Sequence, residues 1–123
     1  MKIVLATSRL REFEEFVAGL DLENHEPILA GSVQEVLEFV QESKPELIIL
    51  DESFVQADIF GLIRHILKLD AMVNTAVITG MDQDEFHQKG EGLGILMSLP
   101  FNPGMQEGRE LMSRLKQVLP SYS

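Results

Sequence analysis

One carboxylate stands at the end of an apolar run, in a position where a side chain can take part in chemistry. Asp51 follows Leu47–Leu50, four consecutive aliphatic residues typical of a strand buried on both faces of a parallel sheet. In open α/β folds, ligands bind at the edge formed by the carboxyl ends of the strands. Asp51 is therefore the candidate centre of a reactive or ligand-binding site, and Glu52 and Ser53 follow it directly.

Cysteine and histidine, the other residue types considered for a reactive or metal site, form none in this sequence. The chain has no cysteine, which excludes a thiol nucleophile, a thiolate metal site and a disulfide framework. The three histidines share no i, i+4 spacing, and we expect no metal site at His25, His65 or His87. Any site must therefore be built around Asp51.

The elements that position Asp51 are five strand-like segments that alternate with five segments of helical period. Such alternation predicts a parallel sheet with helices on both faces and right-handed crossovers. The predicted strands are Lys2–Ala6, Pro27–Ala30, Glu46–Asp51, Thr75–Thr79 and Ile95–Leu99. The predicted helices run from Ser8 to Leu20, from Ser32 to Lys44, from Asp58 to Leu67, over Asp82–Lys89, and from Asn102 to Pro120.

The starts of the helices are predicted from residues that favour N-caps. We expect Ser8 to cap the first helix and Asp58 to cap the third. Ser32 and Glu35 have the spacing of a capping box at the second. Asn102–Pro103 combines an N-cap residue with a proline suited to the first helical position of the last helix.

Length and charge exclude several classes of function. With 123 residues the chain fits one domain, which we place at residues 1–120 with a C-terminal tail at 121–123. The formal charge of −10 disfavours direct nucleic-acid binding, which depends on Lys and Arg neutralising phosphates. The apolar runs are too short for a membrane span, and the start of the chain is interpreted as a strand rather than a signal peptide. We expect a cytoplasmic domain without membrane contact.

The order and spacing of these segments resemble the receiver domain of two-component response regulators over essentially the whole chain. The resemblance rests on Lys2–Leu5, Leu47–Asp51, Val77–Gly80 and Pro100–Phe101, each in the matching place. It implies a flavodoxin-like, doubly wound fold: a five-stranded parallel sheet of order 2-1-3-4-5 with five helices. It also implies a cis bond between Leu99 and Pro100.

In that family an aspartate accepts a phosphoryl group from a histidine kinase, with help from a divalent cation, a lysine and a hydroxyl residue. The resemblance places Asp51 at the acceptor, Thr79 at the hydroxyl, and Ser53 where a backbone carbonyl would touch the metal. The family's acidic pair, its lysine and its aromatic switch residue are missing, and their positions fall on Thr7 and Ser8, on Leu99 and on Leu96.

These losses predict a degenerate receiver, or pseudo-receiver. Mg²⁺ prefers carboxylate ligands, and the hydroxyls of Thr7 and Ser8 are neutral, which leaves Asp51 as the single anionic candidate. Leu99 makes the pocket drier and less favourable for a phosphoryl group. We therefore expect no metal or other cofactor, an Asp51 retained without a reaction, a Thr79 satisfied by backbone, and a role for Thr7 and Ser8 in capping the first helix.

The resulting hypothesis is a bacterial-type signalling domain of two-component, phosphorelay-type pathways that acts as a protein-interaction module without phosphorylation. We expect no output domain within this sequence and, because no nucleophile is paired with a base at the matching positions, no catalysis. The partner would be a signalling protein, a histidine kinase, an output domain or a second copy. It would bind the face formed by Asp82–Lys89, Ile95–Leu99 and Met105–Leu119.

Two alternatives stay open. The first is a working receiver that is phosphorylated on Asp51 with altered metal use, in which case Mg²⁺ would be required. Thr79, Thr7, Ser8 and Ser53 would then line the phosphate pocket. The second is a small-molecule or flavin-binding domain of the same fold.

Overall fold

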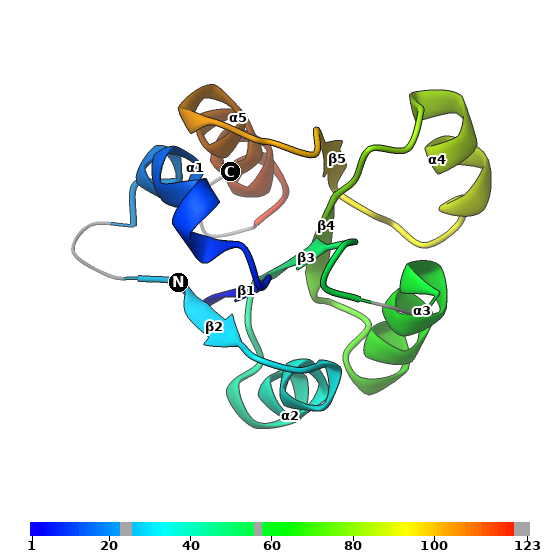
Figure 1. The fold of residues 1–123 in the computed structure, drawn as a ribbon. Coiled ribbons are helices and arrows are strands. Elements are labelled where there is room, and N and C mark those ends of the chain that lie inside the picture. The colour runs from blue at the N-terminus through cyan, green and yellow to red at the C-terminus, as the bar shows by residue number, and fades with distance from the viewer. Residues whose placement is uncertain (23–25, 56–57, 120–123) are drawn as a thin grey trace.

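A computed structural model describes residues 1–22, 26–55 and 58–119. Five strands and five α-helices alternate along this part of the chain (Figure 1). The predicted tail at 121–123, the predicted helix end at Pro120 and His25 lie outside the described residues. The predicted domain boundary therefore stays a prediction.

The sheet has the order β2-β1-β3-β4-β5, and every neighbouring pair is parallel. This confirms the predicted flavodoxin-like topology. β3 is the central strand, with β1 and β4 beside it, and all five of its residues are buried. The strands are β1 (Ile3–Ala6), β2 (Ile28–Ala30), β3 (Leu47–Asp51), β4 (Asn74–Ile78) and β5 (Met97–Leu99).

The helices form two layers, one on each face of the sheet (Figure 1). Side chains that alternate along the strands pack into two separate apolar clusters, one against α1 and α5 and the other against α2, α3 and α4. The helices are the 3-10 turn η1 (Leu10–Phe13), which leads into α1 (Glu14–Leu20), then α2 (Val33–Ser43), α3 (Ile59–Leu69), α4 (Gln83–Lys89) and α5 (Met105–Val118).

Three helix starts have a side-chain cap. The Ser32 hydroxyl accepts a hydrogen bond from the Glu35 amide at 3.1 Å, and the Glu35 carboxylate accepts from the Gly31 amide at 3.2 Å. Asp58 accepts from the Phe60 amide at 3.1 Å, and Asp82 caps α4 in the same way. The predicted caps of Ser32 and Asp58 are therefore confirmed.

The predicted starts of the first and last helices are wrong. Ser8 caps nothing, because the chain first forms η1, and Arg9 stands at its N-cap position without a side-chain cap. The last helix begins two residues later than Asn102–Pro103 predicts, with Gly104 at the N-cap. The Gly104 amide donates to the Glu107 carboxylate at 2.6 Å, which satisfies this helix end without Asn102.

Two glycines allow α1 and α5 to approach closely. A Cβ atom on Gly19 would lie 2.2 Å from the Met105 carbonyl oxygen, and one on Gly108 would lie 2.3 Å from that of Phe16. Real Cβ atoms do not come this close, so the two helix backbones touch where any larger residue would separate them.

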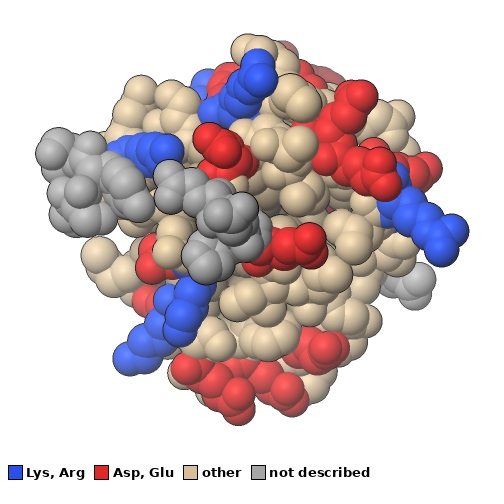
Figure 2. All heavy atoms as spheres, turned by 90° about the vertical axis from the view of Figure 1, so that its left-hand side faces the viewer, with Lys and Arg blue, Asp and Glu red and all other residues tan. Residues whose placement is uncertain are grey.

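Acidic groups are spread over the surface. Figure 2 views the side that carries α1 and β2, where Asp and Glu side chains lie in several places on the described surface. None of the helices in the described ranges is long and apolar enough to cross a membrane.

Candidate functional site

Asp51 ends β3 at the edge of the sheet and is completely buried. Its two carboxylate oxygens accept five hydrogen bonds from three residues. The Thr7 hydroxyl and Arg9 Nε donate to Oδ2 at 2.7 and 3.0 Å. Arg9 Nη2 donates to Oδ1 at 3.1 Å, and Ser53 donates to Oδ1 through its amide at 3.1 Å and its hydroxyl at 2.8 Å. Both oxygens are fully occupied.

Arg9 covers the carboxylate with a two-point contact, because Nε and Nη2 address different oxygens of Asp51. Such bidentate pairs are stronger and more directional than single ionic hydrogen bonds. Only 14% of the Arg9 side chain is exposed. The site that the sequence marks as reactive is therefore closed by an internal cation.

The same guanidinium is fastened to the loop after β5. Arg9 Nη2 also donates to the Phe101 carbonyl at 3.0 Å, and Nη1 donates to Asn102 Oδ1 at 3.3 Å. The guanidinium carbon lies 3.9 Å from the centre of the Phe101 ring and 4.8 Å from that of Phe13, both within cation–π range. One side chain thus joins the end of β1, the end of β3 and the loop before α5.

The charge of Asp51 is stabilised in spite of its burial. Burial raises the pKa of this carboxyl, but the hydrogen bonds from Arg9, Thr7 and Ser53 outweigh burial and hold the pKa of Asp51 below its usual value. Asp51 is therefore an ionised, paired carboxylate at neutral pH.

This arrangement does not suit a metal ion or a phosphoryl group. A carboxylate offers about four lone-pair sites, and five donors already address Asp51. The guanidinium also lies against both carboxylate oxygens, where a Mg²⁺ ion would have to bind. Across residues 1–22, 26–55 and 58–119, no group of three or more His, Cys, Asp or Glu side chains is placed to hold a metal. The donor set thus does not fit the Mg²⁺ ion that the receiver resemblance implies.

Thr79 is directed to a different partner. Its hydroxyl donates to Glu52 Oε1 at 2.6 Å and accepts from the Met81 amide at 3.0 Å. Thr79 is only 4% exposed. The expectation that backbone satisfies Thr79 is therefore incomplete, since the Glu52 carboxylate accepts the hydrogen bond that the Thr79 hydroxyl donates. Neither of these two hydrogen bonds of the Thr79 hydroxyl involves Asp51.

The other predicted pocket residues lie around this site in different ways. The expectation that Thr7 caps the first helix is wrong, because its hydroxyl donates to Asp51 and accepts from the Arg9 amide at 2.9 Å. Ser53 contacts Asp51 with its amide and hydroxyl, and Ser8 is exposed. The expectation that Asp51 is retained without a reaction stays a prediction; its carboxylate joins the turn after β1 to the end of β3.

The two leucines at degenerate positions belong to the packing of β5. Leu99 is 1% exposed and packs with the apolar cluster under α1 and α5. It is Arg9 that covers Asp51. Leu96 is half-buried at the start of the β5 segment. The Leu99–Pro100 bond is trans, so the predicted cis bond is wrong; the trans form is the isomer that X-Pro bonds prefer intrinsically.

Sequence reasoning missed Arg9, the residue that decides this site. Arg9 falls within the predicted first helix, where an arginine side chain is usually solvated. A usable signal was present, because Arg9 lies three residues after the end of β1, and the carboxyl ends of β1 and β3 are neighbours in this topology. An arginine at that edge is within reach of the Asp51 carboxylate.

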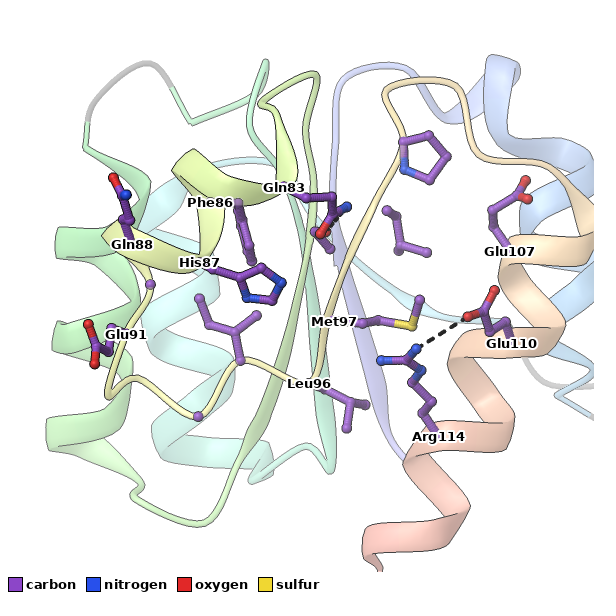
Figure 3. A pocket seen from close by; sticks show the side chains of 16 residues that line it. Gln83, Phe86, His87, Gln88, Glu91, Leu96, Met97, Glu107, Glu110 and Arg114 are labelled. Atoms are coloured by element: carbon purple, nitrogen blue, oxygen red, sulfur yellow. Dashed lines mark hydrogen bonds and ion pairs between the residues drawn. The ribbon is translucent and has the colours of Figure 1, made fainter.

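A second feature lies over β5, where the three segments of the predicted partner face come together. Helices α4 and α5 flank β5 and leave an open groove of about 920 Å³ between them (Figure 3). We call this the α4–β5–α5 groove. Its lining includes Phe86, His87, Leu96, Met97, Glu110 and Arg114.

Comparison with solved structures shows the same fold in receiver domains. The chain is similar to a two-component response regulator from Clostridium difficile, with a TM-score of 0.79, 14% identity and 98% of each chain covered. It is also similar to the REC domain of AraT, a response regulator from Geobacillus stearothermophilus, with a TM-score of 0.76, 19% identity, and 94% of this chain and 92% of that one covered. A two-component response regulator from Legionella pneumophila gives a TM-score of 0.75 at 16% identity, over 96% and 99% of the two chains.

Comparisons at the level of sequence find less. No protein-family model matches the chain, and no curated protein matches it. The similarity to receiver domains is therefore one of fold.

Proposed function

We propose that this chain is a degenerate receiver domain of bacterial two-component, phosphorelay-type signalling, which acts in the cytoplasm through protein contacts without phosphorylation of Asp51. The receiver fold over almost the whole chain supports the signalling class. The observation that carries the proposal is the bidentate contact between Arg9 and the buried carboxylate of Asp51.

Phosphoryl transfer to Asp51 would require that contact to break. The accepting oxygen must be free to attack, and cations must neutralise the charge on the transferred group. Removing one partner of a buried ion pair costs about 3–5 kcal/mol, and we use the lower end as the scale for displacing Arg9, because 14% of its side chain is exposed. About 3 kcal/mol corresponds to a rate roughly 100-fold lower. The missing acids at Thr7 and Ser8 and the missing lysine at Leu99 add to this barrier.

The protein contacts of the proposed function would use the α4–β5–α5 groove. This open groove of about 920 Å³ is lined by residues from all three segments that the sequence assigns to a partner face. The partner would be a signalling protein, and the Asp51 site would serve to hold this end of the sheet in one arrangement.

The test is chemical phosphorylation. The protein is incubated with acetyl phosphate and Mg²⁺, and intact mass is measured beside a receiver domain that accepts phosphate and beside Asp51→Asn. We expect no phosphoryl adduct on this chain while the positive control is modified. Titration with beryllofluoride and Mg²⁺ is expected to leave the amide resonances of Ser53 and Thr79 in place. An adduct that disappears in Asp51→Asn would overturn the proposal and establish a working receiver.

A further inference from the structure

The α4–β5–α5 groove has an apolar floor that the fold leaves partly open. Ile95, Leu96 and Met97 are half-buried on the approach to β5 and at its start, and each of them lines the groove. β5 is also an edge strand, since the sheet ends there. Figure 3 shows the side chains of α4 on one wall and those of α5 on the other, with Met97 between them. Partly exposed apolar side chains in a concave surface favour contact with another apolar group.

The charges that line the groove are mostly negative. The lining has three glutamates, Glu91, Glu107 and Glu110, and one arginine, Arg114. Arg114 is already engaged, with Nη2 lying 3.5 Å from Glu110 Oε1 on the same helix. One carboxylate oxygen of Glu107 accepts a hydrogen bond from the Gly104 amide. The walls therefore present acidic groups around an apolar floor.

A second copy of the chain fits this surface poorly. In a two-fold dimer the same patch meets itself, and a lining with three glutamates and one arginine cannot balance its charge against a second copy. The formal charge of −10 on each chain adds a repulsion at longer range. A partner with positive charges around an apolar centre would meet the groove with opposite sign instead.

We propose that the α4–β5–α5 groove binds a segment of a different protein that presents apolar side chains flanked by lysine and arginine. The apolar side chains would cover Ile95, Leu96 and Met97, and the basic groups would lie against the carboxylates of Glu91 and Glu110. This inference rests on the proposed function, in which the domain acts through protein contacts. It adds the chemistry of the partner and excludes self-association through this face.

The proposal can be tested with two synthetic peptides and the full chain. One peptide is an amphipathic helix with leucine on one face and lysine and arginine beside it; the other has glutamate in place of each basic residue. Binding is followed by chemical shifts of the methyl groups of Ile95, Leu96 and Met97 and of the amides of α4 and α5. We expect the basic peptide to shift these signals and the acidic peptide to leave them unchanged. Binding should weaken by about tenfold or more at high salt, because salt screens exposed charges.

Matched variants locate the binding. Glu91→Lys combined with Glu110→Lys is expected to weaken binding of the basic peptide by about tenfold. Glu14→Lys combined with Glu42→Lys changes the total charge equally but on α1 and α2, away from the groove, and should leave binding nearly unchanged. Equal weakening by both variants would overturn the proposal, because it would mean attraction to the overall negative charge.

Two other outcomes would also overturn it. The first is equal binding of the acidic peptide, or no binding of the basic peptide at any salt concentration. The second is a dimer in sedimentation equilibrium whose contacts shift the groove signals without any peptide. Neither outcome produces a phosphoryl adduct on Asp51, so failure here is distinguishable from failure of the proposed function.

Discussion

The edge of the sheet around Asp51 and the α4–β5–α5 groove differ in how their polar groups are satisfied. At Asp51, every oxygen has its donors, and an arginine with only 14% of its side chain exposed covers the carboxylate. In the groove, apolar side chains are half-exposed, and Glu110 and Arg114 form an ion pair at the surface. A closed polar network contributes to stability, whereas an open apolar surface is available for binding.

The Asp51 site and the groove differ from the usual pattern of open α/β folds in which of them is open to a ligand. The edge at the carboxyl ends of the strands is where open α/β sheets bind ligands. In this chain the part of that edge around Asp51 is filled by the side chains of Thr7, Arg9 and Ser53, and an open groove lies beside the edge strand β5. Substitutions at the Asp51 site should therefore change stability, and substitutions in the groove should change binding.

The largest effect is expected at Arg9. Arg9→Ala leaves the buried carboxylate of Asp51 without its cation and should lower the free energy of unfolding by about 3 kcal/mol. Urea denaturation monitored by circular dichroism measures the change. Arg9→Lys is the matched control, because it keeps the charge but loses the two-point contact, and we expect a smaller loss. A loss below about 0.5 kcal/mol in Arg9→Ala, the range of an exposed ion pair, would contradict the closed site.

The second effect concerns the close contact between α1 and α5. Gly108→Ala puts a methyl group 2.3 Å from the Phe16 carbonyl oxygen, so α1 and α5 must separate. Overpacking of this kind typically costs about 1–3 kcal/mol, and we expect about 2 kcal/mol by the same urea measurement. Gly104→Ala serves as the control, because its Cβ would lie 3.4 Å from Glu107 Oε1, an ordinary contact. If both variants unfold alike, the close approach of the helices is not a determinant of stability.

The third effect is a pH dependence that belongs to Asp51. Its pKa is lower in the folded than in the unfolded chain, so the ionised group stabilises the fold above the unfolded pKa of about 4. This contribution is lost as the pH falls through the lower folded value. The difference in unfolding free energy between the wild type and Asp51→Asn should therefore shrink on acidification. Measuring both proteins over the same pH range cancels the titration of the other carboxylates; a constant difference would contradict the pKa shift.

The smallest change in stability is expected in the groove. Glu91→Lys combined with Glu110→Lys alters exposed side chains. We expect the free energy of unfolding, measured by thermal denaturation, to change by less than about 0.5 kcal/mol. The same variant should lose affinity for a basic peptide. A large destabilisation would show that the groove charges support the fold, and the contrast between the two regions would disappear.

Local patterns in the sequence were enough to predict the scaffold. The aliphatic run before Asp51 defines the central strand, the alternation of strands and helices leads to the parallel sheet, and the caps at Ser32 and Asp58 form as expected. Each of these features depends on residues that are close in sequence. Such patterns also place Asp51 at the ligand-binding edge and bring the groove segments to one side of the molecule.

Only the tertiary structure decided what happens at that edge. Arg9 and Asp51 are 42 positions apart, and no local pattern states whether a polar side chain turns to solvent or to a distant carboxylate. Thr79 likewise turns to Glu52, which lies 27 positions earlier in the chain. The sequence by itself determined where the carboxylate lies. The tertiary structure decided that an arginine closes it, because the fold brings the Arg9 side chain, the Asp51 carboxylate and the Phe101 carbonyl to one place.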